Sequence, residues 1–128
     1  KNLGDFIPQW KEVHMNITDI VLTQEQITNA VDGIMQAVDI TDGYDYVDGK
    51  RAESPSFKKV TMVLPKRKFE RVVVKVYDMK IPLSSEMIEQ KGGSIKVRAK
   101  ALAGRFYFDR ESREYKLSCK AEGLEVLP

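Results

Sequence analysis

The stretch RKFERVVVKVYD, Arg67–Asp78, has the two-residue period of a β-strand and sets the fold class of the chain. Its even-numbered positions Val72, Val74 and Val76 would line one face, as on the core side of a sheet. The opposite face collects rings and cations, namely Phe69, Arg71, Val73, Lys75 and Tyr77. A solvated face needs no rings and a buried face cannot hold unpaired cations, so this face is expected to bind something flat and anionic.

Further alternating runs lie on both sides of this stretch. Residues 44–50 contain the turn signal Asp48-Gly49, and residues 57–64 place Val60, Met62 and Leu64 inward with Phe57, Lys59 and Thr61 outward. A short helix is expected after Ser84 or Ser85, before Gly92-Gly93. Residues 94–104 and 105–127 then predict more strands, with a hairpin turn at 109–112. In that hairpin, Phe106 and Phe108 are expected in the core and Tyr107 on the opposite face with Arg105.

An earlier segment, residues 22–40, predicts a helix over 23–38. Thr23 and Gln26 have the spacing of a capping box at its start. The apolar residues then recur at helical intervals, at Ile27, Val31, Ile34, Met35 and Val38. The stripe would pack on the sheet or, equally, pair with a second copy of the chain in a homodimer.

From Gly43 onward the predicted order is β-β-β-α-β-β, and this order resembles that of the OB-fold, a five-stranded Greek-key barrel. The expected fold is therefore mostly β, with an OB-type barrel domain at 43–128. Residues 1–42 form an added N-terminal segment with its helix. A β-sandwich is the alternative for such short alternating runs.

Composition limits the function classes. The 128 residues suffice for one domain, and they are 42% apolar and 31% charged, as in a globular protein. Residues 1–48 carry a net charge of −7 and residues 49–128 one of +9, so the basic body favours a polyanionic partner. No run approaches the roughly 18 apolar residues of a membrane span, and the N-terminus lacks the apolar region of a signal peptide. The chain starts at Lys1, with Met15 as an alternative start, so residues 1–14 receive no function.

Cys119 is the only cysteine, which excludes an internal disulfide and suggests a reducing, cytoplasmic setting. It alternates with the apolar residues Leu117 and Ala121, so it is expected to be a packed core thiol. A nucleophilic role would need a base, and the one histidine, His14, lies in the doubtful N-terminal segment.

The sequence lacks the common catalytic motifs, so it does not support an enzymatic function. The sequence has no GxGxxG, Walker A, HExxH, CxxC or GxSxG pattern. Aspartates at 39, 42, 45 and 48 do not follow the alternate-position ligand pattern of an EF-hand, so calcium is disfavoured. We expect no catalytic activity, no cofactor and no metal.

The mixture of cations and rings points instead to single-stranded nucleic acid, whose phosphates attract cations and whose unpaired bases stack on rings for roughly 1–3 kcal/mol each. Duplex DNA hides its base faces and would not use exposed rings on a sheet. The expected binding residues are Lys59, Lys66, Arg67, Lys68, Phe69, Arg71, Lys75, Tyr77, Arg98, Lys100, Arg105, Tyr107, Arg110 and Arg113.

In size, element order and a strand pair joined by a basic hairpin, the chain resembles the small single-stranded-DNA-binding, helix-destabilising proteins of phages and mobile elements. The resemblance implies that PKRKFERVVVKVY, 65–77, is the binding strand and AGRFYFDRESREY, 103–115, a flexible basic hairpin. It implies sequence-tolerant binding in DNA replication or transfer, with RNA as the less favoured ligand. The alternative is a protein–protein adaptor whose basic face docks an acidic partner.

Overall fold

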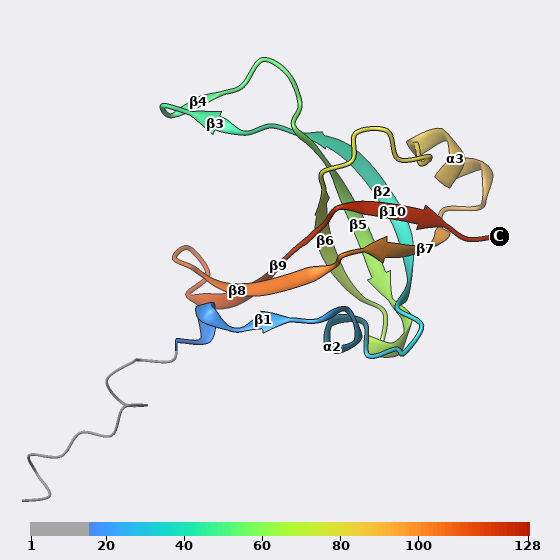
Figure 1. Ribbon diagram of the computed structural model, residues 1–128, viewed down its shortest axis with the longest axis horizontal. Coiled ribbons are helices and arrows are strands. Elements are labelled where there is room, and N and C mark those ends of the chain that lie inside the picture. Colours follow the sequence, from blue (N-terminus) through green and yellow to red (C-terminus); the bar gives the residue numbers. More distant parts are fainter. Residues whose placement is uncertain (1–15) are drawn as a thin grey trace, which may run out of the picture.

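The computed structural model describes residues 16–128, and it is mostly β (Figure 1). His14 and Met15 lie outside the described residues. The strands are β1 Val21–Leu22, β2 Ile34–Gly43, β3 Tyr46–Val47, β4 Lys50–Arg51, β5 Phe57–Leu64, β6 Glu70–Val76, β7 Ile95–Lys100, β8 Ala103–Asp109, β9 Glu114–Ala121 and β10 Gly123–Val126. The helical segments are η2 Ile17–Asp19, α2 Gln24–Thr28, η3 Pro65–Arg67 and α3 Ser85–Gln90. No helix within 16–128 has the length and apolar character needed to cross a bilayer.

Eight strands form one mixed sheet in the order β1-β8-β9-β6-β5-β2-β7-β10, with β1 and β10 at its open edges. All its pairings are antiparallel except that of β6 with β9, which is parallel. β3 and β4 form a separate two-stranded hairpin, which we call the arm and which extends away from the sheet (Figure 1). The prediction of a mostly β protein is confirmed, whereas the large sheet has more strands than the five expected.

The helix predicted over 23–38 is wrong beyond Thr28. The capping box does form, because Thr23 Oγ1 accepts from Gln26 N and Gln26 Oε1 accepts from Thr23 N. The helix then ends at Asn29, whose left-handed backbone at φ 55° closes the last turn. Residues 30–33 of the predicted helix are instead the loop before β2, and residues 34–38 are the first half of that strand, so the proposed helical dimer stripe does not exist as one face.

A β-bulge interrupts the alternation of β2 within the segment that the apolar spacing predicts as helix. The register with β5 shifts between Ala37 and Asp39, which inserts Val38 as an extra residue. The buried positions therefore fall at Met35, Ala37 and Ile40, with intervals of two and then three residues. The apolar residues Ile34, Met35 and Val38 have helical spacing, but in the strand only Met35 is buried, whereas Ile34 and Val38 are partly exposed on the other side.

The core lies on one face of the curved sheet. Its fully buried side chains come from β2, β5, β6, β7 and β9 and include Met35, Val60, Met62, Leu64, Val74, Val76, Val97 and Cys119. Ile27 of α2 and Ile88 of α3 also belong to this cluster. The Ser84 side chain accepts from Met87 N and so caps α3, which confirms the predicted short helix.

Candidate nucleic-acid interface

We call the side of the large sheet opposite the core the outer face. On β6 it carries Arg71, Val73 and Lys75, because Val74 and Val76 are fully buried and Val72 is partly buried against the core. The predicted division of this strand into a core side and a solvent side is thus confirmed.

Three lysines stand in line across adjacent strands of this face. Lys59 of β5 pairs directly with Lys75 of β6, and Lys75 pairs with Lys120 of β9. Neighbouring strands lie about 4.8 Å apart, so the row concentrates three positive charges over two strand spacings. Like charges placed directly opposite each other destabilise a sheet. We call Lys59, Lys75 and Lys120 the lysine row.

No carboxylate offsets the lysine row among residues 16–128. The ion pairs in this part of the chain join Lys58 to Asp42, Arg98 to Glu125 and Lys116 to Asp109. The lysine row takes part in none of them. Lys75 Nζ instead lies 5.2 Å from the centre of the Phe57 ring, a cation–π contact that leaves its charge uncompensated.

Rings gather at one end of the lysine row. Phe57 shares the outer face with Lys59, as expected, but its side chain is buried there. It lies against Gly43, where its ring occupies the space that a Cβ would need. Tyr77 covers Phe57 with ring centres 5.6 Å apart and is itself half exposed. Of these two rings, Phe57 is therefore buried and Tyr77 is accessible to a ligand.

The β8–β9 hairpin adds a second basic and aromatic surface. Its register places Arg105 opposite Ser118 and Tyr107 opposite Lys116, on the outer side. The Lys116 side chain donates to Asp109 at 2.7 Å, and this hydrogen bond holds the pKa of the Asp109 carboxyl below its usual value. The Lys116 ammonium group is thus already paired with a carboxylate.

Phe108 is not in the core, contrary to the expectation. It is 48% exposed and forms an edge-on pair with Tyr115, its cross-strand partner, at 5.3 Å. The β8–β9 hairpin continues beyond the three positions at which β9 pairs with β6. Within residues 16–128, its turn end therefore has no paired strand on the β6 side. Two hollows lie at this divergence, one bounded by Val73 and Tyr107 and the other by Val72 and Phe106.

The fourteen residues predicted to bind fall into separate groups. Those on outward positions of the large sheet are Lys59, Arg71, Lys75, Arg98, Lys100, Arg105 and Tyr107, with Tyr77 directly after β6. Those at the β5–β6 turn are Lys66, Arg67, Lys68 and Phe69. Arg110 and Arg113 lie in the β8–β9 turn. The structure thus distributes the predicted site over the sheet and two turns.

Two of the predicted arginines already have structural partners. The Arg67 guanidinium donates to the carbonyl oxygens of Gln26 and Ile27 and so satisfies the end of α2. Arg98 donates to the Asp32 carbonyl oxygen at 2.7 Å and pairs with Glu125 at 3.6 Å. Both side chains serve the fold, which lowers their availability to a ligand.

Sequence reasoning missed Lys120 and the arm. Lys120 follows the buried Cys119, so strict alternation from that cysteine would have assigned it to the outer face. In the arm, Tyr46 pairs across the strands with Arg51, whose guanidinium carbon lies 3.8 Å from the centre of the Tyr44 ring. The Asp48-Gly49 turn was predicted, but its flanking rings and cation were not considered as a site.

Residues 16–128 contain no group of three or more His, Cys, Asp or Glu side chains placed to hold a metal ion. Cys119 is 1% exposed, and burial raises the pKa of its thiol to about 11, as suits a packed core residue. No protein-family model matches the chain, and no curated protein or solved structure matches it either.

Proposed function

We propose that this protein binds single-stranded nucleic acid, DNA in preference to RNA, without strong sequence preference and without catalysis of its own. The lysine row is the observation that carries the proposal. A polyanion laid across Lys59, Lys75 and Lys120 would remove the mutual repulsion of these three charges and release its own counterions. The replication or transfer of DNA is the process that such binding would serve.

The exposed rings favour a single strand over a duplex. Tyr77 and Tyr107 are about half exposed; Tyr77 packs on Phe57, over which Lys75 also lies, and Tyr107 lies opposite Lys116. Rings of this kind can stack on unpaired bases, whereas the bases of a duplex present only their edges. An acidic protein partner would use the cations but has no need of the rings.

The proposed architecture is an OB-type barrel counted from β2 rather than from Gly43. Three features support it: the antiparallel succession β2-β5-β6, the helix α3 before β7, and the parallel pairing of β6 with β9. In this proposal β7 with β8 forms one long, bent fourth strand, and β9 with β10 forms the fifth. The bend between β7 and β8 falls at Ala101, which has a φ of 54°.

This architecture agrees with the position of the lysine row. OB-folds bind oligonucleotides on the face of their second and third strands, with loops between strands one and two and between four and five. The corresponding elements here are β5 and β6, the arm, and the β8–β9 turn. They carry the lysine pair Lys59–Lys75 and the exposed Tyr46, and the exposed rings of Phe69 and Tyr77 lie directly before and after β6.

A polarisation titration tests the proposed function. Fluorescein-labelled oligo-dT is compared with a duplex of the same length and with oligo-U, each across a range of salt concentrations. We expect oligo-dT to bind at least about tenfold more tightly than the duplex, because only the single strand offers stacking faces. The logarithm of the binding constant should fall with that of salt by about 0.7 per phosphate contacted.

Equal affinity for the duplex and the single strand would reject the stacking surface. If no nucleic acid binds at low salt, the proposal fails, and retention of the chain by an acidic protein would then support the adaptor alternative.

A further inference from the structure

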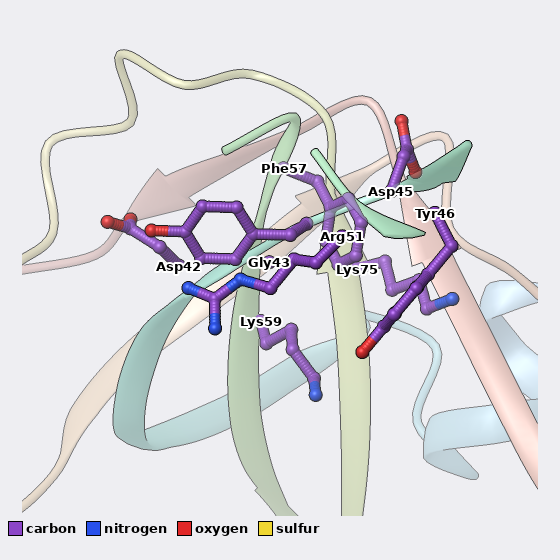
Figure 2. A pocket seen from close by; sticks show the side chains of 9 residues that line it. Asp42, Gly43, Asp45, Tyr46, Arg51, Phe57, Lys59 and Lys75 are labelled. Atoms are coloured by element: carbon purple, nitrogen blue, oxygen red, sulfur yellow. The ribbon is translucent and has the colours of Figure 1, made fainter. Parts of the chain in front are cut away.

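A cavity of about 580 Å³ lies between the arm and the sheet, beside one end of the lysine row (Figure 2). Tyr44, Tyr46 and Arg51 of the arm region bound one side, and Phe57, Lys59 and Lys75 of the sheet bound the other. The arm belongs to the connection between the paired strands β2 and β5, so the cavity lies where this connection leaves the sheet. It brings three cations and three rings around one space.

The sheet side of this cavity is closely packed. The Phe57 ring fills the space above Gly43, on the neighbouring strand β2, which no larger residue would leave open. Tyr77 packs on Phe57, and Lys75 Nζ lies over the same ring. Lys59 and Lys75, on paired strands, therefore lie beside a closely packed aromatic pair.

The arm side presents a ring and a cation to the same space. Figure 2 shows Tyr46 and Arg51 on either side of the space toward which Lys59 extends. Tyr46 is 72% exposed, so one face of its ring is available for stacking. The Arg51 guanidinium rests on Tyr44, which holds it at the rim.

The charge of this cavity favours an anion. Of the two carboxylates that line it, Asp42 is bound to Lys58, and Figure 2 shows that of Asp45 pointing away from Lys59. Lys59, Lys75 and Arg51 remain without a carboxylate partner among the described ion pairs of residues 16–128. A simple anion would need only the cations, whereas a nucleotide also uses the rings.

We infer that this cavity is a subsite for one nucleotide unit, with the phosphate on Lys59 and Lys75 and the base stacked on Tyr46. The inference rests on the proposed function and adds to it a defined site that a free nucleoside monophosphate can occupy. Arg51 lies at the rim, where the next phosphate of a bound strand would pass.

The test follows backbone amide resonances of the isotope-labelled protein while deoxythymidine 5′-monophosphate is added. We expect shifts to concentrate at residues 43–46, 57–59 and 75, which border the cavity. Thymidine, which lacks the phosphate, and inorganic phosphate, which lacks the base, should each bind at least about tenfold more weakly. The same spectra report whether each variant is folded.

Tyr46→Ala should weaken binding of the monophosphate about tenfold, as expected for one lost stacking contact. Lys59→Gln should remove most of the preference for the monophosphate over thymidine. Val47→Ala is the matched control, because Val47 is exposed on the same hairpin and does not line the cavity; its affinity should equal that of the unmodified protein.

A separate titration with oligo-dT distinguishes the possible failures. If oligo-dT binds but the monophosphate shifts no resonance around the cavity, the subsite is rejected and the proposed function stands. If inorganic phosphate alone binds as well as the monophosphate, the cavity is a plain anion site and the subsite is also rejected. If neither oligo-dT nor the monophosphate binds, both proposals fail.

Discussion

Phe69 is held in the left-handed backbone region at φ 60°, directly after Lys68 at φ 57°. Side chains with a Cβ seldom adopt this conformation, which costs roughly 1–2 kcal/mol per residue. The turn is nevertheless fixed, because Phe69 N donates to the Leu64 carbonyl oxygen at 2.9 Å. It keeps the Phe69 ring 64% exposed beside β6.

The replacement Phe69→Gly allows the effect of the ring on binding to be measured separately from its effect on stability. Glycine adopts a positive φ without strain, so the free energy of unfolding should stay the same or rise by up to about 1 kcal/mol. If the ring stacks on a base, the affinity for oligo-dT should fall by roughly 1–3 kcal/mol. Urea unfolding and polarisation binding measure the two effects.

Lys68→Gly is the matched control, since it relieves a similar strain but removes a charge instead of a ring. Its salt dependence should become shallower by about 0.7 if Lys68 contacts a phosphate. A Phe69→Gly protein with unchanged affinity would remove this ring from the site.

Cys119 gives a prediction for the dependence of stability on pH. Burial raises the pKa of its thiol from 9.0 to about 11, so the folded chain retains this proton at pH values where the unfolded chain has lost it. The resulting stabilisation is complete below pH 9 and is lost as the pH rises toward 11. The loss should reach about 2–3 kcal/mol.

Urea unfolding of the protein and of Cys119→Ala at pH 8 and at pH 10.5 isolates this contribution. The difference in stability between the two proteins should shrink at the higher pH, because the alanine variant has no thiol to titrate. A difference that does not change with pH would show that the thiol is accessible to water in the folded state.

At the scale of elements, β2 depends on Gly43 at its end. A Cβ at this position would overlap the Phe57 ring, which has no room to retreat beneath Tyr77. Gly43→Ala should therefore lower the free energy of unfolding by roughly 1–3 kcal/mol. Thermal or urea unfolding measures the change.

Gly123→Ala serves as the control for this effect. Gly123 is also buried in a strand, but its Cβ would lie 3.5 Å from the Lys100 side chain, an ordinary contact. Its stability should change little. Equal losses in the two variants would mean that the close packing of Phe57 on Gly43 does not matter.

The elements that sequence could predict were those with undisturbed alternation. β5 and β6 have no bulge within their pairing, so the inward positions Val60, Val74 and Val76 follow directly from the period of two. β2 could not be predicted, because its bulge at Val38 displaces Ile40 from that period. Phe108 was misplaced because alternation gives the face of a strand but not whether another strand covers it.

The candidate site was predictable only within single strands. Lys59 and Lys75 were identified, yet their direct pairing depends on the register of β5 with β6, which no local pattern encodes. Lys120 joins them through a parallel pairing of strands more than 40 positions apart in the sequence. The hydrogen bonds that Arg67 and Arg98 donate to backbone carbonyl groups likewise join segments far apart in the sequence.

At the scale of the whole molecule, net charge alone does not explain the proposed binding. The chain carries only +2 at pH 7, so an attraction for a polyanion must come from how the charges are arranged. The lysine row is such an arrangement, on one face and without carboxylate partners in the described residues 16–128.

The most direct test compares two double variants of equal net charge, Lys75→Gln with Lys120→Gln, and Lys80→Gln with Lys91→Gln. Lys80 follows β6 in a loop and Lys91 ends α3, so neither belongs to the lysine row. Salt titrations of oligo-dT binding should show a slope shallower by about 1.4 for the first variant, since two phosphate contacts are lost. The second variant should keep the slope of the unmodified protein, whereas equal losses in both variants would contradict a binding face built on the lysine row.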